Sequence, residues 1–357
     1  YVGFVIINIE VLEIVIDGLF GTHRIFSVIG PLYGVLIGVF EVLAALVFIA
    51  VVIFWFRRNV VKIQRFMKSE MKGWPKLDGN LILYFEIVLM GLFIIMNATD
   101  VEFQSMNSGN VISQFFAPMF EGYNVHLIER VAWWVHITGI LVFLNYLYYS
   151  KHLHILLAFP NTYYGSVKPK GQLNNLEAVT NEVKLMMDPD ADPYAATAED
   201  AAPPDKFGAS DVQDLNWVQL LNAYTCTECG RCTSECPANQ TGKKLSPRKI
   251  MMDTRDRLVE VGENIDANNG EFKLDGKQLL GDYITNEELW ACTSCNACVE
   301  ACPVSIDPLS IILEMRRYLV MEQSDAPMEL NNMMSNIENN GAPWPYNQMD
   351  RLNWKND

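Results

Sequence analysis

Hydrophobic residues are concentrated in the first 160 positions, where polar connections separate four long apolar segments. These segments cover residues 1–20, 29–56, 81–96 and 125–149. A helix needs about 20 apolar residues to cross a bilayer, so each segment predicts a membrane helix, the third completed by its flanking residues. In the first segment Glu10, Glu13 and Asp17 fall on one helical face. We expect that face to pack inward, because carboxylates facing lipid are costly; an interfacial helix is the alternative.

The connections between the apolar segments differ in charge, and the difference predicts an orientation. The connection at residues 97–124 contains no lysine or arginine. The connection after the second segment is strongly basic, with Arg57, Arg58, Lys62, Arg65, Lys68, Lys72 and Lys76. Basic loops stay in the cytoplasm. Four crossings then place everything after residue 150 on the cytoplasmic side of a bacterial inner membrane.

The pattern changes after residue 157, where long apolar runs give way to polar sequence. Residues 158–210 predict an acidic, proline-containing linker. Residues 211–357 carry helix-start signals at Ser246-Pro247, Thr285 to Glu288 and Asp307-Pro308. The sequence thus predicts an all-α protein, a membrane bundle of about four helices at 1–157 followed by a soluble helical domain. Its net charge of −15 argues against nucleic acid as a partner.

The candidate chemistry lies in two cysteine runs that use all eight cysteines of the chain. Both have the spacing C-x2-C-x2-C-x3-C-P, by which bacterial ferredoxins hold [4Fe–4S] clusters, with the fourth cysteine crossing to the other cluster. That rule gives two ligand sets. The first set is Cys226, Cys229, Cys232 and Cys302. The second set is Cys292, Cys295, Cys298 and Cys236.

Zinc sites and disulfides are the alternatives for these cysteines. Zinc takes four ligands, often as two C-x2-C pairs, and does not need a third close cysteine before a C-P pair. Disulfides at such short spacing would be strained, and the expected cytoplasmic side is reducing. The runs therefore favour two iron–sulfur clusters over both alternatives.

With these motifs in place, residues 211–357 resemble the helical dicluster ferredoxin domain of heterodisulfide reductase, glycerol-3-phosphate dehydrogenase and lactate-utilisation iron–sulfur subunits. The resemblance includes residues 241–248 (TGKKLSPR) and 340–344 (NGAPW). Residues 1–157 are similar to the haem-b-binding gamma subunit of nitrate reductase, best at residues 150–155 (SKHLHI). Many relatives add a further cysteine-rich domain for substrate chemistry. The resemblance therefore implies an electron-carrying subunit with a separate cytoplasmic redox partner, cysteine-rich or a flavoprotein, in a hetero-oligomeric complex.

The histidines raise the question of haem b and of a quinone site. All five lie in or beside the membrane half: His23, His126, His136, His152 and His154. His126 and His136 are about 15 Å apart along one helix and cannot share an iron. His23 could pair with His136, or alternatively His126, to hold one haem near the outer edge. Lys151, His152 and His154, at the inner end of the last apolar segment, are candidates for stabilising a reduced quinone, or simply membrane anchors.

These observations predict a membrane-bound electron-transfer subunit of a respiratory-type oxidoreductase. Electrons would pass through the two clusters between a cytoplasmic partner and a quinone such as menaquinone, with haem b as a possible carrier. The alternative is a haem-free anchor or assembly subunit that tethers a ferredoxin domain in a larger complex. A redox sensor is a third hypothesis, but no signalling domain is visible. The chain has no catalytic triad and no phosphate or dinucleotide loop, so we expect no catalytic residues of its own.

Overall fold

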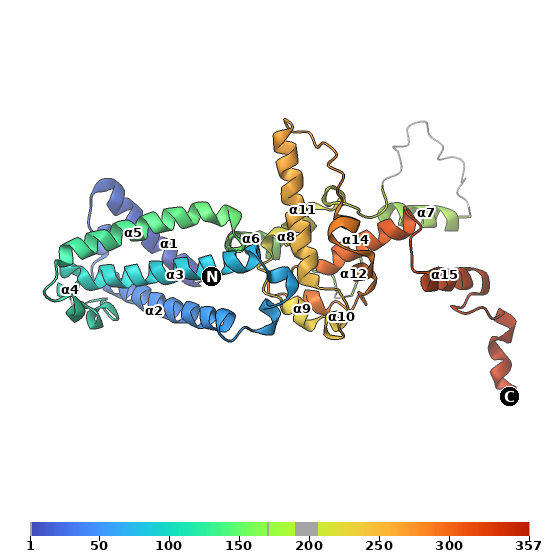
Figure 1. Cartoon of the computed structure of the whole chain (residues 1–357), viewed down its shortest axis with the longest axis horizontal. Coiled ribbons are helices and arrows are strands. Elements are labelled where there is room, and N and C mark those ends of the chain that lie inside the picture. Colours follow the sequence, from blue (N-terminus) through green and yellow to red (C-terminus); the bar gives the residue numbers. More distant parts are fainter. Residues whose placement is uncertain (1, 107, 170, 190–205, 357) are drawn as a thin grey trace. The chain divides into compact units, whose positions relative to one another are not determined.

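The computed structural model describes residues 2–106, 108–169, 171–189 and 206–356 (Figure 1). About 70% of it is helical, and no β-strand occurs in these ranges. The chain forms two compact units. The first unit contains residues 1–155 together with 227–229, and the second contains residues 156–226 and 230–357. An all-α architecture is therefore confirmed, and each unit is described here by itself.

Three helices of the first unit are long and apolar enough to cross a membrane. They are α2 (Pro31–Asn59), α3 (Trp74–Thr99) and α5 (Val125–Tyr146), the last continuing as a 3-10 turn to Tyr149. Helix α3 packs against both α2 and α5. The long apolar faces of these helices leave many large side chains exposed, as expected for surfaces that meet lipid. The three corresponding sequence predictions are confirmed at the level of length and composition.

The first predicted span is helical but differs from the other three. Helix α1 (Val2–Phe20) packs against α2, yet it does not belong to the membrane-length apolar set. Its three acidic residues exclude it from that set. Two of these acids accept hydrogen bonds from groups within the first unit. Glu13 accepts hydrogen bonds from the Phe26 backbone and the Tyr33 hydroxyl, and Asp17 accepts from Thr22 and two backbone N–H groups. The acidic face thus packs inward as predicted, while the crossing itself stays a prediction.

Buried polar contacts hold the long connection between α3 and α5 against the helices. Glu41, in the middle of α2, is fully buried. Its carboxylate accepts hydrogen bonds from the Asn97 amide and from the backbone N–H groups of Ile112 and Ser113. A buried charge is tolerated only when its hydrogen bonds are satisfied, so Glu41 fixes the path of this connection.

The short elements of the first unit are η1 (Ile25–Ile29), η2 (Gln64–Phe66), η3 (Ser69–Met71), α4 (Val101–Ser105), η4 (Ser113–Phe115), η5 (Ala117–Phe120) and η7 (Lys151–Leu153).

The second unit is a set of short helices around one hydrophobic core. Its main members are α11 (Pro247–Ala267) and α14 (Pro308–Met321), which contact each other. Side chains such as Ile250, Ile311 and Met315 are fully buried between them. The other helices are α6 (His154–Tyr163), α7 (Glu177–Met187), α8 (Trp217–Thr225), α9 (Arg231–Glu235), α10 (Pro237–Gln240), α12 (Asn286–Trp290), α13 (Ala297–Glu300) and α15 (Met328–Asn340), with turns η8 (Val212–Asp214), η9 (Leu279–Tyr283) and η10 (Gln348–Lys355).

The three helix-start signals are confirmed by the hydrogen bonds that they make. Ser246 accepts from the Lys249 N–H at the start of α11, and Asp307 accepts from Ser310 at the start of α14. Thr285 and Glu288 form a reciprocal capping box at α12. Each side chain satisfies an N–H group that the first helical turn leaves without a partner.

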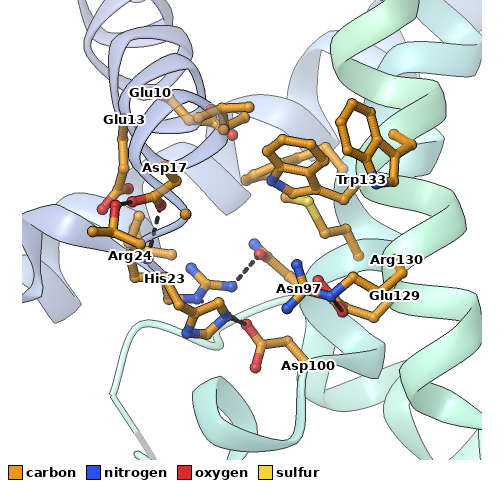
Figure 2. A pocket seen from close by; sticks show the side chains of 18 residues that line it. Glu10, Glu13, Asp17, His23, Arg24, Asn97, Asp100, Glu129, Arg130 and Trp133 are labelled. Atoms are coloured by element: carbon orange, nitrogen blue, oxygen red, sulfur yellow. Dashed lines mark hydrogen bonds and ion pairs between the residues drawn. The ribbon is translucent and has the colours of Figure 1, made fainter.

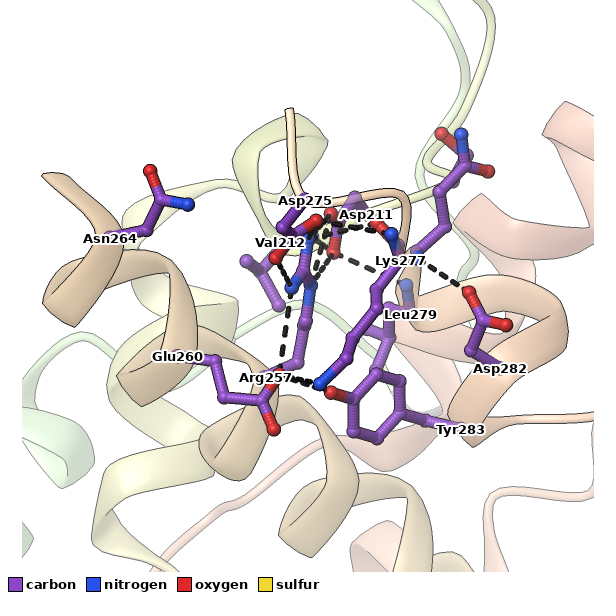
Figure 3. Close-up of polar contacts among 12 residues, drawn as sticks. Asp211, Val212, Arg257, Glu260, Asn264, Asp275, Lys277, Leu279, Asp282 and Tyr283 are labelled. Atoms are coloured by element: carbon purple, nitrogen blue, oxygen red, sulfur yellow. Dashed lines mark hydrogen bonds and ion pairs between the residues drawn. The ribbon is translucent and has the colours of Figure 1, made fainter. Parts of the chain in front are cut away.

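The polar, glycine-containing stretch at residues 262–281 predicts a loop or hairpin, and this prediction is wrong at its start, because α11 continues to Ala267. Figure 3 shows how the remaining segment is held: Arg257, with no exposed surface, binds the carboxylates of Asp211 and Asp275 and the Lys277 carbonyl. A buried arginine with two carboxylates fixes the segment without strand pairing. Of the predicted acidic linker at residues 158–210, residues 190–205 lie outside the described residues, and the described part contains the end of α6 and the helix α7.

Candidate functional site

The two cysteine runs share a backbone path that their spacing alone does not specify. Glu228 and Ser294, each just before the second cysteine of its run, have φ angles of 57° and 55°. Gly230 and Asn296, just after that cysteine, have φ angles of 74° and 59°. Left-handed residues turn the chain sharply, and alternating such residues point backbone N–H groups into a concave surface that favours negative charge. Both runs therefore have the same left-handed turn on each side of their second cysteine.

A short helix follows this turn in each run and carries the third cysteine. Cys232 lies in α9 and Cys298 in α13, and the two helices pack against each other. A proline follows the fourth cysteine of each run; Pro237 begins α10. The α9–α13 contact places the end of one run beside the other, which is the juxtaposition that a crossing fourth ligand requires.

The cysteines of the second predicted set line one pocket in the second unit. Its wall contains Cys236 from the first run together with Cys292, Cys295 and Cys298 from the second. Leu245, Leu309 and Ile312 are among the apolar side chains that complete it. A four-cysteine pocket with apolar walls fits a [4Fe–4S] cluster, because such a cluster takes one thiolate per iron and is tuned by burial.

In the described ranges, no three histidine, cysteine or acidic side chains are arranged to hold a single metal ion. The four irons of a cluster spread their thiolates more widely than a single ion spreads its ligands. Within the four-cysteine pocket, burial raises the pKa of the Cys298 thiol to about 12. Iron binding would displace that proton, because the ligand is the thiolate. Backbone N–H groups also reach sulfur: Ser294 donates to Cys292 and Ile306 donates to Cys302, each at 3.4 Å.

The family comparison agrees with this geometry. Residues 225–306 match the model of the 4Fe-4S dicluster domain. We refer to these residues as the dicluster domain, after the family model that they match. The match begins one residue before Cys226 and ends four residues after Cys302, so it contains all eight cysteines.

Curated relatives extend the similarity beyond the dicluster domain. The whole chain is 29% identical to a probable iron–sulfur-binding oxidoreductase, FadF, of Bacillus subtilis, covering 51% of that protein. It is 27% identical over 88% of its length to the EtfAB:quinone oxidoreductase of Syntrophomonas wolfei, covering 45% of that protein. Over 46% of the chain, it is 32% identical to a probable membrane-anchored ferredoxin of Chromohalobacter salexigens, covering 26% of that protein.

Heterodisulfide reductase subunits C and D of Methanosarcina species are also homologous to parts of the chain. The chain spans about half the length of the first two curated relatives. No solved structure gives a significant match. The dicluster domain, the three apolar helices and the membrane-anchored relative together indicate an iron–sulfur electron-transfer protein of the membrane.

The three residues predicted for a quinone site, Lys151, His152 and His154, lie next to one another, but the Lys151 side chain is bound to other protein groups. The Lys151 ammonium donates to the Pro75 carbonyl at 2.8 Å and is paired with Asp78 and Glu228, all within the first unit. Its side chain is 8% exposed. The Lys151 ammonium thus has two hydrogen-bond partners and a further carboxylate, Asp78, at 3.8 Å, so a direct contact between this lysine and a quinone stays a prediction.

His152 and His154 are better suited to the role of a quinone ligand. Their rings lie edge to face with centroids 5.6 Å apart, and His152 also packs on Phe143. His154 Nδ1 contacts the Lys151 carbonyl at 3.0 Å. Burial lowers the pKa of His152 to about 4 and lowers that of His154 as well. Both imidazoles are therefore neutral at pH 7. His154 donates through Nδ1 to the Lys151 carbonyl, so its Nε2 is an acceptor, whereas His152 has one donor and one acceptor nitrogen.

Asp78 organises this region and was missed by the sequence analysis. The carboxylate is buried and accepts from the Tyr146 and Ser150 hydroxyls, each at 2.6 Å, and from the Lys151 N–H at 3.1 Å. These bonds join the start of α3 to the end of α5. The sequence did contain a signal for Asp78, an acid between a basic loop and an apolar segment. An acid at such a position needs polar partners.

The histidines predicted to hold haem are not brought together in one cavity. His23 lines a cavity of about 230 Å³ between α1, α3 and α5, whereas neither His136 nor His126 is among the lining residues (Figure 2). The two ring nitrogens of His23 lie 3.2 Å from the carboxylates of Asp100 and Glu102, and its hydrogen bond to Asp100 raises its pKa. In this arrangement His23 has no nitrogen free for iron.

The other two histidines have different surroundings. His136 is buried, and its Nδ1 contacts the Leu89 carbonyl at 3.0 Å, while His126 is exposed in the first turn of α5. A carbonyl contact of this kind orients a ring nitrogen toward a metal in many metal sites. Among the described residues, no contact brings His23 and His136 together, and the haem that they would share stays a prediction.

Proposed function

We propose that the chain is the electron-transfer subunit of a quinone-linked oxidoreductase in the bacterial cytoplasmic membrane. The observation that carries this proposal is the dicluster domain attached to three membrane-length helices in one chain. Two [4Fe–4S] clusters would supply one-electron chemistry at potentials set by their surroundings. The residues of the chain hold the carriers, exclude water from them and connect them to the membrane.

The ligand assignment follows the crossing rule. Cys292, Cys295, Cys298 and Cys236 would hold one cluster, supported by their common pocket. Cys226, Cys229, Cys232 and Cys302 would hold the other, supported by the shared backbone path of the two runs and by the α9–α13 contact.

The acceptor in this proposal is a quinone such as menaquinone. One relative carries quinone in its name, and another is a membrane-anchored ferredoxin. His152 would donate to a quinone oxygen, His154 would accept from a quinol hydroxyl through Nε2, and Lys151 would act through Asp78 by fixing the helix ends. The basic connection after α2 supports a cytoplasmic position for the dicluster domain. A cysteine-rich protein or a flavoprotein in the same complex would supply or receive the electrons.

The alternative is a haem-free anchor that tethers the dicluster domain without reacting with quinone. The crowded surroundings of His23 favour the haem-free part of this reading. It differs from the leading proposal in one measurable respect, since an anchor gives quinone no route to the clusters.

A stopped-flow experiment separates these readings. The detergent-purified chain is reduced with dithionite without oxygen and mixed with a menaquinone analogue, and the return of visible cluster absorbance is followed. We expect the quinone to oxidise the clusters, at least 10-fold more slowly in His152→Ala. His126→Ala, an exposed histidine in the first turn of α5, is the matched control and should be unchanged. Clusters that quinone leaves reduced would contradict the quinone route and favour the anchor.

A further inference from the structure

We propose that Arg316 is a positioning residue for the second cluster: its guanidinium holds the Cys292–Cys295 turn in place and raises that cluster's reduction potential. The inference rests on the proposed function, because it assumes that the four-cysteine pocket holds a [4Fe–4S] cluster. It goes further by assigning a role to a residue outside both cysteine runs.

The position of Arg316 follows from the packing of α14. This helix starts at the Asp307 cap, and Leu309, Ile312 and Met315 face the core. Leu309 and Ile312 also form part of the wall of the cysteine pocket. Arg316 lies one helical turn after Ile312 and is half-buried. Helix α14 thus forms one wall of the pocket and places the Arg316 guanidinium beside it.

The guanidinium reaches three points around the first turn of the second run. It donates to the Leu289 carbonyl through Nε at 3.1 Å and through Nη2 at 2.6 Å. It also donates to the carbonyl of Cys292 itself, and Nη1 lies 3.4 Å from the Ser294 hydroxyl. Its Cζ lies 5.0 Å from the centre of the Trp290 ring, which covers one face of the guanidinium. Only a planar fork with several donors can make these contacts at once.

These contacts restrain a left-handed part of the run. Ser294 has a φ of 55°, a conformation that is unfavourable for an L-residue. Arg316 bonds the Cys292 carbonyl before this residue and approaches its side chain. The arginine therefore stabilises a turn that sets the direction of Cys292 and Cys295.

The charge acts on the cluster as well as on the backbone. The guanidinium lies beside a ligand of this cluster, since it donates to the Cys292 carbonyl and approaches the Ser294 hydroxyl. Reduction adds a negative charge to the cluster, and a nearby cation stabilises the more negative state. Because the guanidinium is half-buried, solvent screens this attraction less than it would at the surface. Removal of the charge should therefore lower the reduction potential.

A purely structural role for Arg316 is the competing explanation. The Leu289 carbonyl belongs to the end of α12, and arginine side chains commonly bind such carbonyls. That role predicts a loss of stability alone. A change in potential with both clusters intact would not follow from it.

The test is an anaerobic redox titration of the full chain followed by electron paramagnetic resonance, with spin quantification. In Arg316→Gln, we expect one of the two Nernst components to move to lower potential and the other to stay in place. Arg316→Lys keeps the charge and loses the fork, so its shift should be in the same direction and smaller.

The matched control is Arg317→Gln, on the same helix. Arg317 pairs with Glu314 at 2.6 Å and with the Asn174 carbonyl, and it makes no contact with the second run in the described residues. It should leave both potentials unchanged. Two intact clusters at unchanged potentials in Arg316→Gln, or equal shifts in both glutamine variants, would overturn the inference. If Arg316→Gln loses its cluster, an unshifted Arg316→Lys overturns it instead. Absence of cluster signals from the unsubstituted chain would contradict the proposed function itself.

Discussion

The two cysteine runs follow the same backbone path but have different surroundings. In both, left-handed residues flank the second cysteine and a short helix carries the third. Their exposure differs. Cys226 and Cys236 of the first run and Cys298 of the second are buried, but the second run also has a cysteine exposed to solvent, Cys295. The equivalent cysteine of the first run, Cys229, is half-buried.

This difference shows which properties a motif controls. Spacing and left-handed turns determine how the sulfurs are presented, because they are local to the run. Burial depends on elements distant in sequence, such as α11 and α14 around the second pocket. Two clusters with the same ligand count should thus differ in solvent access and in potential.

The largest effect should come from removing a crossing cysteine. Cys236→Ala removes a thiolate from the pocket that it shares with Cys292, Cys295 and Cys298. We therefore expect the cluster of the second run to be lost, with about half of the iron and acid-labile sulfide. Cys302→Ala should remove the other half. Element analysis with paramagnetic resonance distinguishes the two losses.

The control for this experiment is Ser234→Ala, in the same short helix as Cys232. It should retain the full iron content. If Cys236→Ala removed the first-run signal and left the second intact, the crossed assignment would be wrong.

Solvent access should produce the next largest effect. The cluster held by Cys295 has an exposed ligand, so a chelator or oxygen should destroy it several-fold faster than the first-run cluster. The single-cluster variants Cys302→Ala and Cys236→Ala allow each decay to be followed alone by visible absorbance. Equal decay rates would remove the proposed difference between the clusters.

The smallest effect should come from the left-handed positions. Gly230→Ala adds a side chain at a φ of 74° and should lower the free energy of unfolding by about 1 kcal/mol. Asn296→Gly, at a φ of 59° in the second run, should be neutral or slightly stabilising. Denaturant unfolding of the full chain measures both. A destabilising glycine at position 296 would show that the Asn296 side chain has a further role.

The sequence predicted local features well. The caps at Ser246, Thr285 and Asp307 each act through neighbours within three residues, so their signals are complete within the motif. The apolar segments were equally clear, although α3 begins seven residues before its predicted start because Trp74 and Pro75 open the helix.

Features that depend on distant partners could not be predicted. Asp78 acquires its role from residues about 70 positions away, and Arg257 from Asp211 and Asp275. Lys151 looked available in the sequence because nothing there revealed its partners. Arg316 lies outside both cysteine runs, and only the packing of α14 brings it to Cys292. Long-range polar contacts of this kind have no fixed spacing, which is why motif reading misses them.

The central claim is that one chain holds two [4Fe–4S] clusters. Its most direct test is the iron and acid-labile sulfide content of the anaerobically purified protein, with Mössbauer spectra of the same sample. We expect about eight irons and about eight sulfides per chain in cubane-type clusters. Zinc without labile sulfide, or iron at about half that content with all eight cysteines intact, would contradict the account.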